Sequence, residues 1–271
     1  MHPLISSLQN ERVKAVVKLR DRKGRNRENL FVIDGEREIA LALNAGVAVR
    51  QLYIPAECSR EVERLAHHAA AKDAEIFPVS PSVMEKLAYG DRRQSVVAVA
   101  VPPDVSLAAF ARAMESKSQP PLFLVLDRVE KPGNVGAAAR SADAVGATGV
   151  LLSDGATDLF NPNVVRASRG AVFTLPFAEA DGAASVAWLR ERNVTLFAAR
   201  TDGAVNYTEC DFRGPTAFIL GSEAEGLGSA WRGADITAVR LPMHGAADSL
   251  NVSVTAAVLL FEALRQRSIA G

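Results

Sequence analysis

Cysteines are few, aromatic residues are sparse, and long apolar runs are absent from this chain. Its two cysteines, Cys58 and Cys210, are too few for a disulfide framework and cannot build a zinc site alone. No apolar run reaches the roughly 18 residues that a membrane span requires. The start of the chain also turns charged too early for a secretory signal. We therefore expect a soluble, cytoplasmic protein without a membrane partner.

The composition instead suits a folded protein of one large or two small domains. The chain has 271 residues, of which 48% are hydrophobic and 23% are charged, a balance that supports a buried core and excludes a disordered chain. Its formal net charge is zero, but residues 1–30 contain eight lysines and arginines against three acidic residues. Such a basic segment is typical of a phosphate-binding surface, although a solvated helix face has the same composition.

Hydrophobic periodicity divides the chain into two α/β regions, at 1–102 and 121–271. Proline pairs flank the segment 103–120, which we interpret as a linker with one short helical piece. In the first region the pattern predicts an amphipathic helix over 4–20 and a polar loop over 21–30. Alternating elements then predict a βαβ-type sandwich. Its strands are expected at 30–35, 49–55, 76–80 and 96–102, and its helices at 36–46, 58–74 and 80–90.

The second region alternates in the same way and predicts a mainly parallel sheet covered by helices on both faces. At least five short apolar strands are separated by helices. A helix followed by a strand is expected over 161–175, and a long amphipathic helix over 250–267. The remaining strands are expected at 122–129, 149–154, 194–200, 217–227 and 238–243, with further helices at 134–147 and 186–193.

The loop after the first strand of this region is a candidate anion site. Gly133, Asn134 and Gly136 open a helix whose free backbone N–H groups can hold an anion. Arg140 follows Asn134 by six residues, close to two helical turns, so both side chains can face the same side. An ordinary capped helix with a solvent-facing arginine explains the same residues, and both interpretations stay open at this point.

Two further loops carry polar residues, again with simpler explanations beside the functional ones. Glu223 lies in a glycine-rich loop and is either a ligand-facing carboxylate or an exposed acid; no G-x-G-x-x-G pattern is present, which disfavours a Rossmann site. Ser249 and Asn251 precede the last helix, and capping accounts for both. The order of His244, Asp248 and Ser249 is weak evidence for a hydrolase without a nucleophile elbow. The histidines are scattered, so we expect no metal site.

Three of these segments together resemble a known family. NVGAAAR (134–140), ILGSEAEGL (219–227) and the segment 241–267 are similar, in the same order, to the three motifs of SpoU/TrmH-type RNA 2′-O-ribose methyltransferases of the SPOUT superfamily. Residues 1–102 resemble the ribosomal-protein-like RNA-binding domain of many members. Within them, LFVIDGEREIALAL (30–43) is similar to the family's F-x-x-E-G segment, although Asp34 replaces the usual glutamate.

The resemblance implies a trefoil-knotted catalytic domain at 121–271, a substrate-binding domain at 1–102, and a homodimer. It implies S-adenosylmethionine as the cofactor and RNA as the partner, with ribosomal RNA of the 23S type favoured over tRNA. The cofactor-binding residues implied are Gly221, Leu241, Leu250, Met243, Thr201 and Gly203. The catalytic residues implied are Arg140, Asn134, Glu223, Ser249 and Asn251. The basic residues expected to hold RNA are Arg20, Arg22, Lys23, Arg25 and Arg27.

Within this interpretation Arg140 has two possible roles. Arginine side chains keep their protons across the physiological range, which makes them poor bases. We therefore favour binding of the neighbouring phosphate and stabilisation of the developing alkoxide, with a general-base role as the second choice. The alternatives for the whole protein are a tRNA 2′-O-methyltransferase, a non-catalytic RNA-binding protein with a cofactor pocket, an α/β enzyme with another nucleotide cofactor, and a small-molecule methyltransferase.

Overall fold

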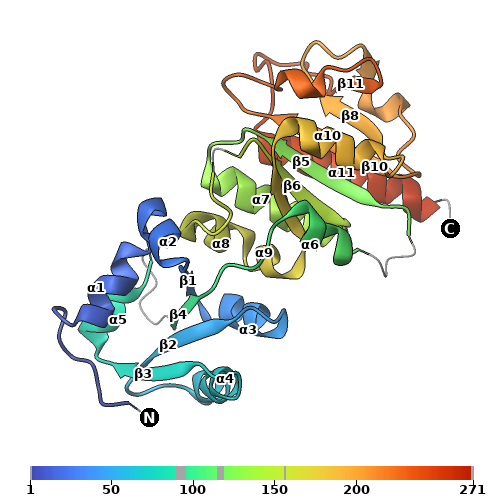
Figure 1. Cartoon of the computed structure of the whole chain (residues 1–271). Coiled ribbons are helices and arrows are strands. Elements are labelled where there is room, and N and C mark those ends of the chain that lie inside the picture. Colours follow the sequence, from blue (N-terminus) through green and yellow to red (C-terminus); the bar gives the residue numbers. More distant parts are fainter. Residues whose placement is uncertain (1, 90–95, 115–118, 156, 270–271) are drawn as a thin grey trace. The chain divides into compact units, whose positions relative to one another are not determined.

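The computed structural model describes residues 2–89, 96–114, 119–155 and 157–269, and the chain forms two compact units (Figure 1). Unit 1 contains Met1–Pro103 and also Asp158–Thr174, a segment from the middle of the second sequence region. Unit 2 contains Asp104–Thr157 and Leu175–Gly271. The expected linker holds the predicted short helix, α6 (Leu107–Arg112), and its residues 115–118 lie outside the described residues. No helix among the described residues is long and apolar enough to cross a membrane.

Unit 1 is built on a four-stranded sheet in the order β1-β4-β2-β3. β4 pairs antiparallel with β1 and β2, whereas β2 and β3 are parallel. All four strands lie where the sequence predicts them: β1 (Phe31–Asp34), β2 (Val49–Pro55), β3 (Glu75–Val79) and β4 (Val97–Ala100). The helices are α1 (Glu11–Lys18), α2 (Arg22–Glu28), α3 (Glu36–Asn44), α4 (Arg60–Ala70), α5 (Pro81–Leu87), α8 (Pro162–Ser168) and α9 (Ala171–Thr174).

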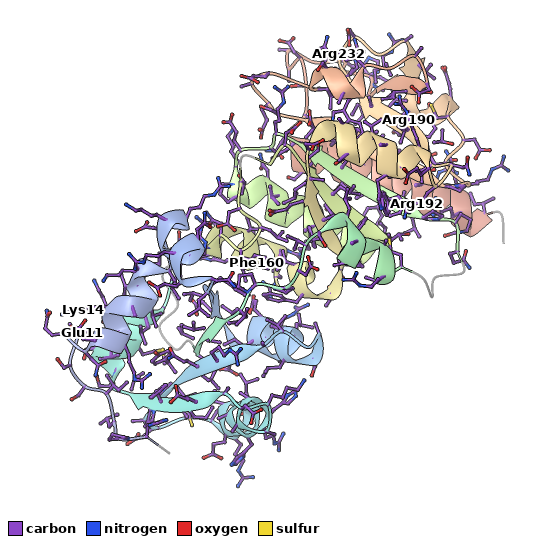
Figure 2. All side chains as sticks on the ribbon, in the orientation of Figure 1. Glu11, Lys14, Phe160, Arg190, Arg192 and Arg232 are labelled. Atoms are coloured by element: carbon purple, nitrogen blue, oxygen red, sulfur yellow. The ribbon has the colours of Figure 1, made fainter. Side chains whose placement is uncertain are left out.

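Two predictions for the N-terminal segment are wrong. The predicted helix over 4–20 begins only at Glu11, because Asn10 caps it and Ile5 forms a parallel bridge with Val79 beside β3. On this shorter helix Glu11 and Lys14 form an i,i+3 ion pair (Figure 2). The predicted polar loop over 21–30 is mostly helix α2. Its sequence has no apolar stripe, so hydrophobic periodicity does not predict this helix.

The inserted segment of unit 1 contributes a small aromatic cluster and corrects another expectation. The rings of Phe31 and Phe160 lie 4.7 Å apart, centroid to centroid, and Phe173 packs on the same Phe31 ring (Figure 2). Phe173 belongs to the short helix α9, where the sequence pattern predicts a strand. The strand instead begins after Pro176 as β7 (Phe177–Ala180).

Unit 2 is built on a seven-stranded, fully parallel sheet in the order β7-β6-β5-β10-β8-β11-β9. This confirms the predicted α/β class and parallel sheet. The strands other than β7 are β5 (Leu122–Asp127), β6 (Gly149–Ser153), β8 (Thr195–Ala199), β9 (Val205–Asn206), β10 (Thr216–Gly221) and β11 (Ile236–Arg240). The sequence pattern does not predict β9, which has only two residues.

Helices cover both faces of this sheet (Figure 1). α6 and α10 (Gly182–Arg190) lie on one face, where Phe110, Phe123 and Trp188 pack ring against ring in the core. α7 (Pro132–Ala144) and α11 (Val252–Ile269) contact each other, and α11 also contacts β10. Because every strand is parallel, the loops that follow β5, β8, β10 and β11 gather at one edge of the sheet.

Candidate cofactor pocket and polar cluster

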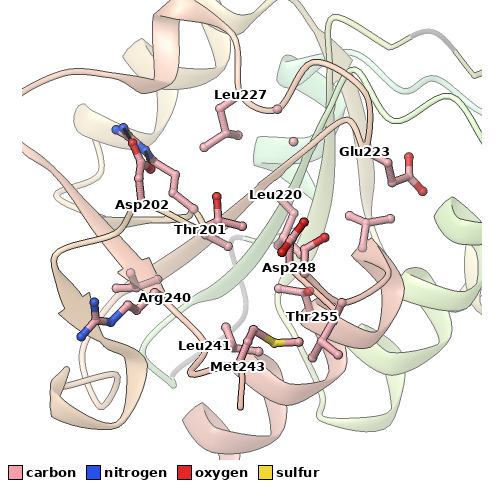
Figure 3. Close-up of a pocket in the computed structure, with 18 of the residues that line it drawn as sticks. Thr201, Asp202, Leu220, Glu223, Leu227, Arg240, Leu241, Met243, Asp248 and Thr255 are labelled. Atoms are coloured by element: carbon pink, nitrogen blue, oxygen red, sulfur yellow. Dashed lines mark hydrogen bonds and ion pairs between the residues drawn. The ribbon is translucent and has the colours of Figure 1, made fainter. Parts of the chain in front are cut away.

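A cavity of about 1040 Å³ lies at this carboxyl edge of the unit 2 sheet, between the loops that follow β8, β10 and β11 (Figure 3). Glu223 lies at one side of the pocket and Asp202 at the other. Five of the six predicted cofactor residues line it, namely Thr201, Gly221, Leu241, Met243 and Leu250. Other apolar lining residues, which the sequence analysis did not single out, are Leu220, Leu227 and Val252.

The sixth predicted residue, Gly203, is buried behind the pocket wall rather than lining it. A β-carbon there would come within 2.7 Å of the backbone carbon of Val239 in β11. Gly203 therefore lets the turn after β8 lie directly against β11. Arg200 holds the same turn through two hydrogen bonds to Asp202, of 2.8 and 2.6 Å. These hydrogen bonds from Arg200 keep the pKa of the Asp202 carboxyl below its usual range.

The loop after β10 folds back tightly over Gly221. The N–H of Gly226 donates to the carbonyl oxygen of Ser222 at 2.9 Å, and Gly226 adopts a left-handed backbone conformation with φ of 66°. A β-carbon on Gly221 would overlap the carbonyl group of Gly226 and come within 2.7 Å of the N of Leu227. Only glycine fits there, because the loop returns over its own start. Gly221 and Gly226 both line the pocket.

Three of the five predicted catalytic residues form one hydrogen-bonded cluster. The side-chain amide of Asn134 donates to the Glu223 carboxylate, and that of Asn251 donates to the Oδ1 atom of Asn134 at 3.1 Å. Asn251 also accepts hydrogen bonds from the backbone and the hydroxyl of Ser253. Lys131, which the sequence analysis did not select, extends its ammonium to 4.0 Å from the same carboxylate. The first and third motifs therefore meet at the Glu223 loop.

The other two predicted catalytic residues are exposed. Ser249 lines the pocket, and Arg140 lies on α7, the helix that also carries Asn134. Within the part of the chain that the structure describes, no hydrogen bond or ion pair engages the Arg140 guanidinium, so it is available to a ligand. His244 and Asp248 line the pocket beside Ser249, but the described residues show no hydrogen bond that would join the three into a hydrolase triad.

The five basic residues of the N-terminal segment do not form one equivalent set. Arg20 donates to the backbone carbonyl oxygens of Lys86 and Ala88, at 2.7 and 2.9 Å, at the end of α5. Arg25 is 4% exposed and pairs with Asp158 at 2.6 Å. Burial of this pair leaves Arg25 no path to a phosphate, so its expected RNA contact is corrected to a structural role. The exposed basic residues of α2 are Arg22, Lys23 and Arg27.

Metal ligation receives no support from the described residues, among which no group of three or more histidine, cysteine, aspartate or glutamate side chains is placed to hold an ion. Cys58 and Cys210 are both free and partly buried. Burial raises the pKa of each thiol, which disfavours the reactive thiolate form.

The parallel sheet and the pocket at its carboxyl edge define an α/β ligand-binding protein, a class in which small ligands bind where the strands end. The chain belongs to the SpoU rRNA Methylase family, which its residues 121–261 match. Residues 10–98 match the MRM3-like substrate binding domain. Both matches confirm the resemblance found in the sequence motifs.

Named relatives span most of the chain. One is a 23S rRNA (uridine(2479)-2′-O)-methyltransferase of Streptomyces viridochromogenes, 32% identical over 92% of this chain and 87% of the relative. Another is a 23S rRNA (guanosine-2′-O-)-methyltransferase of Ralstonia nicotianae, 34% identical over 78% of this chain and 84% of the relative. The two relatives modify different nucleosides, a uridine and a guanosine, of the same RNA.

Solved structures agree with both units of the fold. An RNA 2′-O ribose methyltransferase shares 39% identity, with a TM-score of 0.81 over 98% of this chain and all of the other. The SpoU methyltransferase AviRb of Streptomyces viridochromogenes, solved with the cofactor AdoMet (S-adenosylmethionine), shares 32% identity. Its TM-score is 0.86 over 97% of this chain and all of the other.

Proposed function

We propose that this protein transfers a methyl group from S-adenosylmethionine to a ribose 2′-hydroxyl of ribosomal RNA, of the 23S type. The observation that carries the proposal is the Asn134–Glu223–Asn251 cluster beside a pocket at the carboxyl edge of the sheet. The family and the names of its relatives support the same reaction. A nucleoside substrate suits this arrangement because one loop, residues 222–228, borders both the pocket and the cluster.

The pocket residues fit S-adenosylmethionine. Apolar side chains suit the flat adenine ring, and the glycines at 221 and 226 let the ring lie close to the backbone. The residues proposed to hold the cofactor are Gly221, Leu241, Leu250, Met243 and Thr201, with Gly203 supporting the turn from behind. When bound, S-adenosylmethionine supplies an activated methyl group on a sulfonium centre. The chain's own residues then have to exclude water and orient the hydroxyl.

The cluster and Arg140 are proposed to handle the ribose. Glu223 can only accept hydrogen bonds when ionised, so it fixes the Asn134 amide with its NH₂ toward Glu223 and its oxygen toward Asn251. The Arg140 guanidinium would bind the neighbouring phosphate and stabilise charge that develops on the 2′-oxygen. Ser249, at the pocket wall, would position the ribose. A general-base role for Arg140 is the alternative.

Unit 1 is proposed to bind the RNA substrate, in line with its match to a substrate binding domain. The proposal includes a substrate-binding domain at 1–102, a linker at 103–120 and a methyltransferase domain at 121–271. The segment 158–174 of the methyltransferase domain packs in unit 1. The exposed cations Arg22, Lys23 and Arg27 on α2 would hold phosphates, supported by Arg20 at the end of α1. Phosphate contacts of this kind depend strongly on salt, whereas RNA is distinguished from DNA by its shape and 2′-hydroxyls.

The knot, the dimer and the compartment belong to the same proposal. In the order β5-β10-β8-β11, strand β10 lies between β5 and β8, which both precede it in the sequence. A trefoil knot in unit 2 requires an insertion of this kind. Exposed apolar side chains on α11, Val254 at 46% and Phe261 at 49%, support a contact with a second copy of the chain. Ribosomal RNA as the proposed substrate supports a cytoplasmic location.

The experiment that tests this proposal is transfer of labelled methyl from S-adenosylmethionine to unmodified ribosomal RNA and to tRNA. Arg140→Ala, Arg140→Lys and the control Arg265→Ala run alongside; Arg265 is an exposed arginine on α11 that pairs with Glu262. We expect labelled ribosomal RNA, lost with Arg140→Ala and retained with the control. Labelled tRNA alone would move the substrate to tRNA. Cofactor binding without transfer to RNA or ribosomal particles would favour the non-catalytic alternative.

A further inference from the structure

The loop 222–228 has a second side, which faces the end of β5 rather than the pocket. Asp127 is the last residue of β5 and is fully buried. Its Oδ2 atom accepts a hydrogen bond from the N–H of Gly228 at 2.7 Å, and its Oδ1 atom accepts one from the hydroxyl of Ser153 at 3.0 Å. The indole N–H of the buried Trp231 donates to that same hydroxyl oxygen at 3.3 Å. The carboxylate of Asp127 therefore anchors the end of the loop to the sheet.

Arg128, the next residue, reaches the middle of the same loop. Its Nη1 donates to the Glu225 carboxylate at 2.8 Å, and its Nη2 donates to the carbonyl oxygen of Gly226 at 3.2 Å. Its Nε faces Asp127 Oδ2 at 3.6 Å, and this buried nitrogen has no hydrogen-bond partner among the described residues. One guanidinium thus lies against the acidic end of β5 and two residues of the loop.

The backbone of Arg128 is also unusual. Its φ is 54°, in the left-handed region that residues other than glycine and asparagine adopt at a cost. In this conformation its N–H donates to the carbonyl oxygen of Ser153 in the neighbouring strand at 2.9 Å. The bent backbone turns the chain out of β5 at the point where the side chain meets Glu225 and Gly226. A strained residue held by this many contacts is typical of a functional site.

We propose that Arg128 is a positioning residue for the cofactor: it holds the 222–228 loop in the shape that binds S-adenosylmethionine. The inference rests on the proposed function of the pocket. Gly226, whose carbonyl oxygen Arg128 holds, lines that pocket together with Gly221 and Leu227. Without the guanidinium the loop keeps its anchor at Gly228 but loses the one at Glu225 and Gly226. The cofactor then has to order the loop as it binds, and its affinity falls.

Arg128→Met tests this inference because methionine keeps the aliphatic stem and removes the charged hydrogen bonds. We expect the Kd for S-adenosylmethionine, measured by calorimetry without RNA, to rise about tenfold. The KM for S-adenosylmethionine should rise equally, while kcat at saturating cofactor stays within about threefold, because bound cofactor restores the loop. Arg128→Lys keeps one of the two contacts, so its Kd should rise about threefold.

Three further variants test whether Arg128 holds the loop or only adds general stability. Glu225→Ala should weaken cofactor binding less than Arg128→Met, because it breaks only the contact between Arg128 and Glu225. The double variant should bind no more weakly than Arg128→Met alone, because Arg128→Met has already broken that contact. Arg213→Met is the matched control: Arg213 makes a two-pronged pair with Asp211 on the surface of the same unit, away from the pocket. It should leave the Kd unchanged.

The possible results give distinct conclusions. If the wild type binds S-adenosylmethionine normally and the Kd of Arg128→Met lies within twofold of the wild-type value, the proposal that Arg128 holds the 222–228 loop is wrong. A loss of kcat with no change in Kd would also overturn it. Failure of the wild type itself to bind S-adenosylmethionine would instead contradict the proposed function. If Arg128→Met does not fold, the comparison of Arg128→Lys with Arg213→Met decides the question.

Discussion

The side-chain amide of Asn251 donates a hydrogen bond of 3.1 Å to the side-chain oxygen of Asn134, across 117 residues of sequence. Asn134 in turn donates to Glu223, so one amide joins the start of α7, the loop after β10 and the residue before α11. Because Glu223 accepts and Asn251 donates, only one orientation of the Asn134 amide satisfies both partners. This amide is therefore the central group of the polar cluster.

Asn134→Asp is expected to disable the cluster. An aspartate cannot donate to Glu223, and the two carboxylates would repel each other. We expect kcat for methyl transfer to fall about 100-fold, while the Kd for S-adenosylmethionine changes less than about threefold. Asn163→Asp is the matched control, an exposed asparagine in unit 1 that donates to the hydroxyl of Tyr89. Wild-type kcat in Asn134→Asp would remove this residue from the site.

Gly221→Ala should act on cofactor binding rather than on the chemical step. The added β-carbon would overlap the backbone of Gly226 and Leu227, so the loop over the pocket has to move. We expect the Kd for S-adenosylmethionine to rise at least about tenfold. Gly214→Ala serves as the control, since nothing lies within 4 Å of a β-carbon at that position. Unchanged cofactor affinity in Gly221→Ala would show that the loop does not contact the ligand.

The exposed cations of α2 should control RNA affinity through charge. Replacing Arg22, Lys23 and Arg27 by glutamine is expected to weaken RNA binding and to lower the slope of log K against log salt by about 2. Cofactor binding should not change. The control replaces Arg50, Arg60 and Arg64, three exposed arginines on β2 and α4 of the same unit. Equal effects of the two triple variants would show that α2 is not a specific RNA surface.

Unit 1 should lose stability at high pH because of Tyr53. Burial raises the pKa of Tyr53 to about 12, from a usual value near 10. Between these two values the unfolded chain loses a proton that the folded chain keeps, so the free energy of unfolding falls by about 1.4 kcal/mol per pH unit. Below about pH 10 the residue has no effect.

Absorbance of the tyrosinate ion measures this titration directly. Tyr53→Phe removes the late-titrating tyrosine and should flatten the decline in thermal midpoint between about pH 10 and 12. A wild-type chain in which Tyr53 titrates near the usual pKa of tyrosine would contradict the prediction.

Much of the fold follows from local patterns in the sequence. Apolar runs of strand length between helical patterns predicted all four strands of unit 1 and the parallel sheet of unit 2. The clearest runs are β5 and β6, which are buried along their whole length, and β10, which is buried up to its last residue. Local capping also matches the sequence, since the hydroxyl of Ser80 accepts the hydrogen bond from the backbone N–H of Val83 at the start of α5. The three motifs identified the family by their sequence resemblance, and their loops follow strands that end at the same edge of the sheet.

The errors fall where distant residues determine the local structure. α2 has no apolar stripe, and its Gly24 packs directly against the backbone of Lys18, which a β-carbon would overlap. Arg25 of the same helix donates to the carbonyl oxygen of Leu19 at 2.9 Å and pairs with Asp158. No pattern within residues 21–30 contains that information, because the partner lies 133 residues further along the chain.

The sequence by itself determined the alternation of elements, the family, and the residue types that the chemistry needs. Only the tertiary structure decided which of these residues meet: it joined Asn134, Glu223 and Asn251, buried Arg25, left Arg140 exposed, and brought Arg128 against the pocket loop. The physical reason is the distance along the sequence over which each effect acts. Periodicity and capping act within a few residues, whereas burial and charge pairing depend on groups that only the folded chain brings together.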